Sequence, residues 1–147
     1  MTAGGGGRPG RVLGIDVGSV RIGVAVCDPD RILATPVETV ARTPGDRADV
    51  DRIAALSSEY EVVAVVIGMP RTLRNTAGAA ADAAREFGTA VAAAIAPVPV
   101  EYFDERFTTV TAQQALRASG RSAKSSRQVI DQAAAVAILQ GWLDAGR

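Results

Sequence analysis

The chain has 147 residues, of which 48% are hydrophobic and 22% charged, and its 16 basic and 16 acidic side chains give a formal net charge of zero. This length suits one domain with a buried core, and a neutral chain would need a local basic patch to bind a polyanion. Histidine is absent, which excludes Ser-His-Asp and Cys-His nucleophilic sites and His-ligated zinc. Carboxylates are therefore the natural carriers of any chemistry.

The bulk sequence also predicts where the protein works. A single cysteine, Cys27, cannot form an internal disulfide, and its apolar neighbours predict a buried structural thiol. Charged residues, glycine and proline interrupt every apolar stretch, so no membrane span is expected. Residues 1–10, which include the glycine run at 4–7, are expected to form a flexible tail without the apolar segment of a signal peptide. We therefore expect one cytoplasmic domain over residues 11–147.

The first third of the chain predicts three strands. Residues 12–17 and 22–26 are apolar runs separated by a Gly-Ser turn, which is typical of a β-hairpin. A third strand is predicted over residues 32–40. Pro36 either weakens the middle of this strand or places it at an edge of the sheet, because proline cannot donate a ladder hydrogen bond.

The rest of the chain alternates between helices and strands. A helix is predicted over residues 46–60, with Asp46 as its N-cap, and the continuous β-branched run at 62–67 predicts a strand covered on both faces. A long alanine-rich helix over 76–96 and a short strand over 98–103 follow. The last elements are helices over 108–118 and 128–143, separated by a polar segment at 119–126. This order predicts an α/β domain whose mixed sheet is antiparallel first and parallel later, flanked by helices.

Three acidic positions lie in apolar surroundings. Asp16 is inside the first strand, where a carboxylate is costly unless it is paired, hydrogen-bonded or metal-bound; the alternative is an aspartate bonded to its own hairpin turn. Glu105 and Asp104 follow the strand that ends at Phe103, and one of them could cap the next helix or pair with Arg106; alternation does not choose between them. Asp131 is on the apolar stripe of the last helix, or is a first-turn acid favoured by the helix dipole.

One economical explanation is that carboxylates from three elements converge on divalent cations. Oxygen ligands suit Mg²⁺ or Mn²⁺. Two such ions can activate a water molecule and stabilise the leaving oxygen of a phosphodiester, and this chemistry needs no histidine. Trp142 shares a helix stripe with Asp131 and is expected to belong to the core.

Four segments resemble, in order, the motifs of the YqgF/RuvX family. They are residues 14–25 (GIDVGSVRIGVA), 67–70 (IGMP), 104–109 (DERFTT), and 130–135 with 138–140 (IDQAAA and ILQ). The resemblance implies an RNase H-like fold and a nuclease. The resemblance implies one of two roles proposed for this family: resolution of Holliday junctions, or maturation of the 5′ end of pre-16S rRNA. Matched by position, the resemblance implies that Asp16, Glu105 and Asp131 form the catalytic and metal site. The loop at residues 71–75 is more basic than expected for the family.

A basic, acid-free stretch is the expected nucleic-acid surface. No acidic residue occurs between Arg106 and Ile130, and arginine and lysine side chains there can contact phosphates without reading base sequence. A solvated loop would give the same composition. Arg21, on the first hairpin, could instead be structural. The predicted nucleic-acid contacts are Arg71, Arg74, Arg106, Arg117, Arg121, Lys124 and Arg127.

Two other classes of function stay open on the sequence. An actin-like or sugar-kinase ATP-binding domain also begins with a Gly-x-Asp-x-Gly hairpin, but it normally needs two such domains and leaves Asp131 unexplained. ATP-dependent thermal stabilisation would favour it. A non-catalytic binding module of the same fold is the other alternative. The expected partner is a structured rRNA precursor or branched DNA, and a homodimer would suit a symmetric junction.

Overall fold

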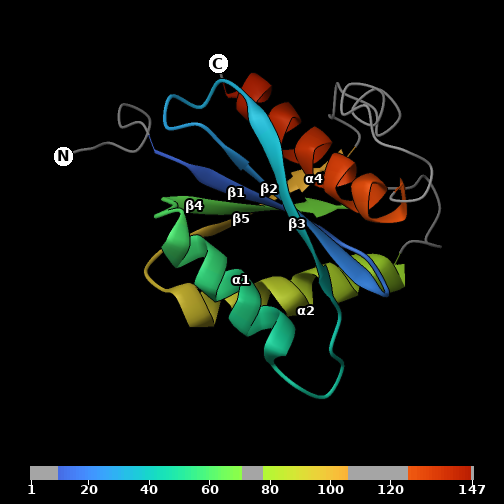
Figure 1. The fold of residues 1–147 in the computed structure, drawn as a ribbon. Helices are drawn as coiled ribbons and strands as arrows, with labels where there is room; N and C mark the ends of the chain where they lie inside the picture. The colour runs from blue at the N-terminus through green and yellow to red at the C-terminus, as the bar shows by residue number, and fades with distance from the viewer. Residues whose placement is uncertain (1–9, 71–77, 106–125, 147) are drawn as a thin grey trace.

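A computed structural model describes residues 10–70, 78–105 and 126–146 of the chain (Figure 1). Within these ranges it contains five strands and three helices. Their bounds are β1 Val12–Val17, β2 Arg21–Cys27, β3 Ala34–Ala41, α1 Ala48–Glu59, β4 Ala64–Met69, α2 Gly78–Ile95, β5 Val100–Asp104 and α4 Ser126–Ala145. The helix predicted over 108–118 lies outside the described residues. None of the helices described is both long and apolar enough to cross a membrane.

The five strands form one mixed sheet in the order β3-β2-β1-β4-β5. The pairs β1–β2 and β2–β3 are antiparallel, whereas β1–β4 and β4–β5 are parallel. The prediction of antiparallel strands followed by parallel ones is therefore confirmed. In the parallel half, β1, β4 and β5 run in the same direction, so their carboxyl ends lie side by side at the same end of the strands.

The third strand is an edge strand, as Pro36 indicates. It begins at Ala34 and not at Ile32 because the preceding backbone is held elsewhere. The Asp28 Oδ1 atom accepts hydrogen bonds from the Ile32 N–H at 2.8 Å and from the Leu33 N–H at 2.7 Å. This side-chain-to-backbone bonding keeps the loop out of the sheet ladder.

Helices cover both faces of the sheet, with α1 and α2 on one side and α4 on the other (Figure 1). The alternation of side chains along each strand separates the two cores. The core under α1 and α2 is made of large aliphatic side chains, including Leu13, Ile15, Ile22, Val24, Ile53, Leu56, Val65, Ile67 and Val91. The core under α4 uses smaller residues, including Val12, Ala25, Cys27, Ala34, Ala64, Val66, Ala135, Ile138 and Leu139.

Glycines bring α4 unusually close to the sheet. A Cβ atom at Gly14 would lie 2.6 Å from the Leu139 Cβ, and one at Gly68 would lie 2.3 Å from the Ile138 Cδ1. At Gly23 the obstacle is backbone, because a Cβ there would stand 1.8 Å from the Asp131 carbonyl oxygen. Side chains at these positions would push the helix away, so the glycines fix where α4 and its acid lie.

The start of α1 differs from the prediction. The N-cap is Arg47, which makes no side-chain cap hydrogen bond, so Asp46 is wrong as the N-cap. Asp46 is the residue before the N-cap, and its Oδ1 accepts the Ala48 N–H at 2.5 Å. A reciprocal pair holds the first turn: Thr43 Oγ1 accepts the Asp49 N–H at 3.1 Å, and Asp49 Oδ2 accepts the Thr43 N–H at 3.2 Å.

Candidate active site

Asp16 lies near the carboxyl end of the central strand β1, on the face covered by α4. Its register partner on β2 is Gly23, the glycine beneath the Asp131 backbone. Burial, followed by the charges of Glu105 and Asp131, raises the pKa of Asp16 from 3.8 to about 6. The structure therefore brings these three sequence-predicted acids into one electrostatic environment, although they belong to three separate elements.

The acid after β5 that acts on Asp16 is Glu105. Asp104 is the last residue of β5, and Glu105 follows it. Of these two neighbours, Glu105 is the one whose charge raises the Asp16 pKa. Burial and the neighbouring charge of Asp104 in turn raise the pKa of Glu105. Like charges gathered in a partly buried site favour protonation, and they also favour binding of a cation.

Asp131, on α4, makes a direct ion pair with Arg21 on β2. The Arg21 Nε donates to the Asp131 Oδ2 at 2.6 Å, and the two side chains are 37% and 22% exposed. Arg21 therefore acts on the acidic site itself, in addition to joining a strand to a helix 110 residues away. No sequence pattern pointed to this pair, because the contact depends on where α4 crosses the sheet.

The three acids do not already form a ligand cage. Within the described ranges, no group of three acidic or cysteine side chains is arranged to hold a metal ion. The residues nevertheless have the right chemistry, because carboxylate oxygens are the ligands that Mg²⁺ and Mn²⁺ prefer. In this structure the Asp131 carboxylate is instead paired with the Arg21 guanidinium.

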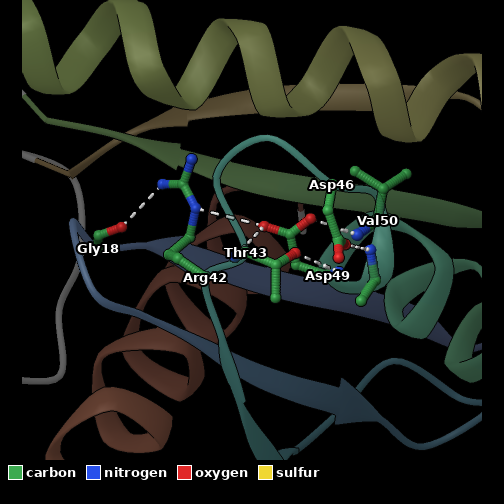
Figure 2. A network of polar contacts seen from close by, with 7 residues as sticks. Gly18, Arg42, Thr43, Asp46, Asp49 and Val50 are labelled. Atoms are coloured by element: carbon green, nitrogen blue, oxygen red, sulfur yellow. Dashed lines mark hydrogen bonds and ion pairs between the residues drawn. The ribbon is translucent and has the colours of Figure 1, made fainter.

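A second polar network supports the hairpin turn that follows Asp16 (Figure 2). The Arg42 Nη1 donates to the Gly18 carbonyl oxygen at 2.9 Å, and its Nε lies 3.5 Å from the Asp49 Oδ2. Asp49 is only 5% exposed, and it also accepts the Val50 N–H at 2.8 Å. The Arg42 guanidinium lies over the Phe87 ring, 5.6 Å from its centroid. This network ties α1 and α2 to the turn beside the acidic site.

Neither Arg42 nor Asp49 was singled out from the sequence, so this network was not predicted. A signal was available, since an aspartate four residues before Ile53 shares the buried face of α1.

Two other interpretations are confirmed. Cys27 is a buried free thiol whose sulfur accepts the Val12 N–H at 3.2 Å, and Trp142 packs against the core under α4.

Most of the predicted nucleic-acid contacts cannot be placed. Arg71, Arg74, Arg106, Arg117, Arg121 and Lys124 lie outside the described residues. Arg127 belongs to the first turn of α4, and the position of its side chain is likewise outside what is described. The basic surface therefore stays a prediction.

Comparison with known proteins agrees with this arrangement. Residues 10–145 match the profile of a family described as RuvX, Holliday junction resolvase. A relative from Rhodococcus opacus is 59% identical over 138 residues, covering 92% of this chain and 78% of its own. One from Mycolicibacterium smegmatis is 57% identical over 140 residues, covering 94% and 82%. Both carry the name "Putative pre-16S rRNA nuclease".

Solved structures resemble the fold at lower identity. RuvC of Thermus thermophilus in complex with a Holliday junction superposes with a TM-score of 0.54 at 21% identity, covering 90% of this chain and 92% of RuvC. A second T. thermophilus RuvC structure gives a TM-score of 0.53 at 23% identity. The expected RNase H-like fold is thus confirmed, and the family match favours a nuclease over an ATP-binding domain. The chain belongs to the RuvX family of nucleases.

Proposed function

We propose that this nuclease is divalent-metal-dependent and that Asp16, Glu105 and Asp131 are its metal ligands. The observation that carries the proposal is the pKa of Asp16, which burial and the charges of the other two acids raise to about 6. Such a cluster has a net negative charge that a cation relieves. When bound there, Mg²⁺ or Mn²⁺ would supply a nucleophilic water and stabilise the leaving oxygen of the phosphodiester.

The residues of the chain have separate tasks in this proposal. Asp16 would bind the metal from the central strand of the sheet, under α4. Glu105 and Asp131 approach from β5 and from the start of α4. The basic residues that follow Glu105 in the sequence would contact phosphates and orient the strand to be cut.

The proposed substrate is the 5′ end of the 16S rRNA precursor. The names of relatives at 55–59% identity support this choice. A four-way DNA junction is the second candidate, favoured by the description of the family and by the likeness to RuvC bound to such a junction. For a symmetric junction we propose that two copies act together, each cutting one strand. We propose the cytoplasm as the place of either reaction.

The test is cleavage of both substrates by the same preparations. A precursor fragment spanning the 16S 5′ end and a synthetic four-way junction are incubated with Mg²⁺, with Mn²⁺ and with EDTA. Asp16→Asn is the active-site variant, and Asp30→Asn, at an exposed loop position, is the matched control. We expect Asp30→Asn to cut like the wild type and Asp16→Asn to lose cleavage. Equal cleavage by Asp16→Asn, or full cleavage in EDTA, would refute the metal site.

A further inference from the structure

The pair formed by Arg21 and Asp131 is on the same face of the sheet as Asp16 and includes one of the three acids. Arg21 is two residues before Gly23 on β2, and Gly23 is the register partner of Asp16. Residues two apart on a strand project to the same face of the sheet, so Arg21 is on the α4 side with Asp16. Its Nε reaches the Asp131 Oδ2 at 2.6 Å. A fixed positive charge therefore contacts one of three clustered acids.

Resting on the function proposed above, we propose that Arg21 is a built-in counter-cation of the acidic site. Its guanidinium neutralises Asp131 in the metal-free protein and competes with a divalent cation for that carboxylate. Arg21 therefore acts through Asp131 and sets how tightly the site binds metal. Its effect on binding is negative, so its removal tightens the binding.

Electrostatics decides the sign of the effect. A guanidinium stays charged at every physiological pH and cannot leave by losing a proton. A divalent cation that binds the same carboxylate adds two further positive charges at a few ångströms, and the repulsion at that distance is large. An orienting hydrogen bond to a ligand usually favours metal binding. Here the donor itself carries a full charge, so repulsion outweighs orientation.

Three roles for Arg21 predict three different results when its charge is removed. If Arg21 only joins β2 to α4, the metal affinity stays the same. If it orients Asp131 as a ligand, the affinity falls. If it is a counter-cation, the affinity rises, because the site gains one net negative charge. Metal affinity measured without nucleic acid therefore separates these roles.

The experiment measures Mn²⁺ binding to the isolated protein by calorimetry, with no nucleic acid present. The variants are Arg21→Gln and Arg21→Met, which remove the charge, and Arg21→Lys, which keeps it. Arg52→Gln is the matched control, because Arg52 also forms a short ion pair, with Glu38 at 2.8 Å, between β3 and α1. The control removes the same charge away from the acids, where salt screens its effect.

We expect Arg21→Gln and Arg21→Met to bind Mn²⁺ about tenfold more tightly than the wild type, since the site then carries one more net negative charge in contact with the cation. Arg21→Lys and Arg52→Gln should keep affinities close to that of the wild type. Unchanged or weaker binding by both neutral variants overturns the inference. If a neutral variant unfolds in EDTA, the Mn²⁺ concentration that restores its far-UV circular dichroism is measured instead. Restoration below the wild-type dissociation constant supports the inference, and its absence overturns it.

A failure of the inference about Arg21 can be told apart from a failure of the proposed nuclease function. If the wild type cleaves only with a divalent cation and Asp16→Asn does not cleave, the nuclease site stands, even when Arg21→Gln leaves the Mn²⁺ affinity unchanged. If neither substrate is cut, the proposed function fails, while the ratio of Mn²⁺ affinities still decides the role of Arg21.

Discussion

Gly23 on β2 lies directly beneath the backbone of Asp131 on α4, and no other residue type fits that contact. A Cβ atom at position 23 would stand 1.8 Å from the Asp131 carbonyl oxygen and 3.1 Å from the Gln132 nitrogen. The same glycine is the register partner of Asp16. One small residue therefore sets the distance between a strand acid and a helix acid that lie far apart in the sequence.

Gly23→Ala is expected to displace the start of α4 and to destabilise the protein. The obstacle is helix backbone, which cannot rotate away, so the cost should reach or exceed the roughly 1–3 kcal/mol typical of overpacking. Urea unfolding in EDTA measures the change. Gly78→Ala is the matched control, since a Cβ there meets nothing within 4 Å, and alanine is favoured over glycine in a helix. Equal stability of the two variants would show that α4 does not depend on Gly23.

Asp16→Asn is expected to stabilise the metal-free protein at neutral and alkaline pH. The folded pKa of Asp16 is raised from 3.8 to about 6, so the folded state binds the proton more tightly than the unfolded state does. The stability that Asp16 contributes is therefore fully present below pH 3.8 and is lost as the pH rises through about 6. A shift of this size corresponds to up to about 3 kcal/mol.

The measurement compares the urea unfolding of Asp16→Asn and wild type at pH 4 and pH 8 in EDTA. The variant should be more stable at pH 8, and the two proteins should converge at pH 4. Asp30→Asn, whose position is exposed, should follow the wild type at both values. A stability difference that does not change with pH would contradict the raised pKa of Asp16.

Arg42→Met is expected to destabilise the protein by about 3 kcal/mol, because it leaves the Asp49 carboxylate buried without its cation. It also removes the 2.9 Å hydrogen bond to the Gly18 carbonyl. The double variant Arg42→Met/Asp49→Asn should recover part of the loss, because the unpaired charge is then gone. Arg52→Met, in an exposed ion pair, should change stability little. A loss no larger than that of Arg52→Met would mean that the network of Figure 2 does not support the fold.

Neutralising the predicted basic surface should weaken nucleic-acid binding by a similar factor for every base sequence, because phosphate contacts do not read the bases. Each of Arg121→Gln, Lys124→Gln and Arg127→Gln should lower the slope of log K against log salt by about one if its side chain contacts a phosphate. Fluorescence anisotropy with a labelled junction and a labelled rRNA fragment measures the slope. Arg52→Gln is the control for a charge on the α1 side. Slopes equal to that of the control would exclude these residues from the binding surface.

The elements with strong local signals could be predicted from the sequence. The strands β1, β2 and β4 are apolar runs rich in valine and isoleucine, and the edge position of β3 is one of the two alternatives that Pro36 indicated. The apolar spacing of α1 identified its buried face. These features depend on neighbouring residues, so a short stretch of sequence determines them. The N-cap of α1 was wrong because the helix begins one residue later than expected, after Arg47, and Thr43, outside the expected helix, joins Asp46 in bonding its first turn.

The contacts of the site could be predicted only in part. Asp16, Asp131 and the pair Asp104 and Glu105 were singled out because they are acids in apolar surroundings, and the choice of Glu105 came from the resemblance to the YqgF/RuvX family. The ion pair of Asp131 with Arg21 and the role of Gly23 were not, because both depend on how α4 crosses the sheet. Such pairings between distant segments follow from tertiary packing and leave no local pattern.

The edge strand β3 also has a consequence for how two chains can meet. Its Pro36 has no N–H to offer, and the Gln140 side chain on α4 accepts the Ala34 N–H at 3.0 Å and donates to the Ile32 carbonyl at 3.0 Å. A strand arriving from another molecule finds part of this hydrogen-bonding edge already used. The sheet is therefore partly protected against growth on its β3 side.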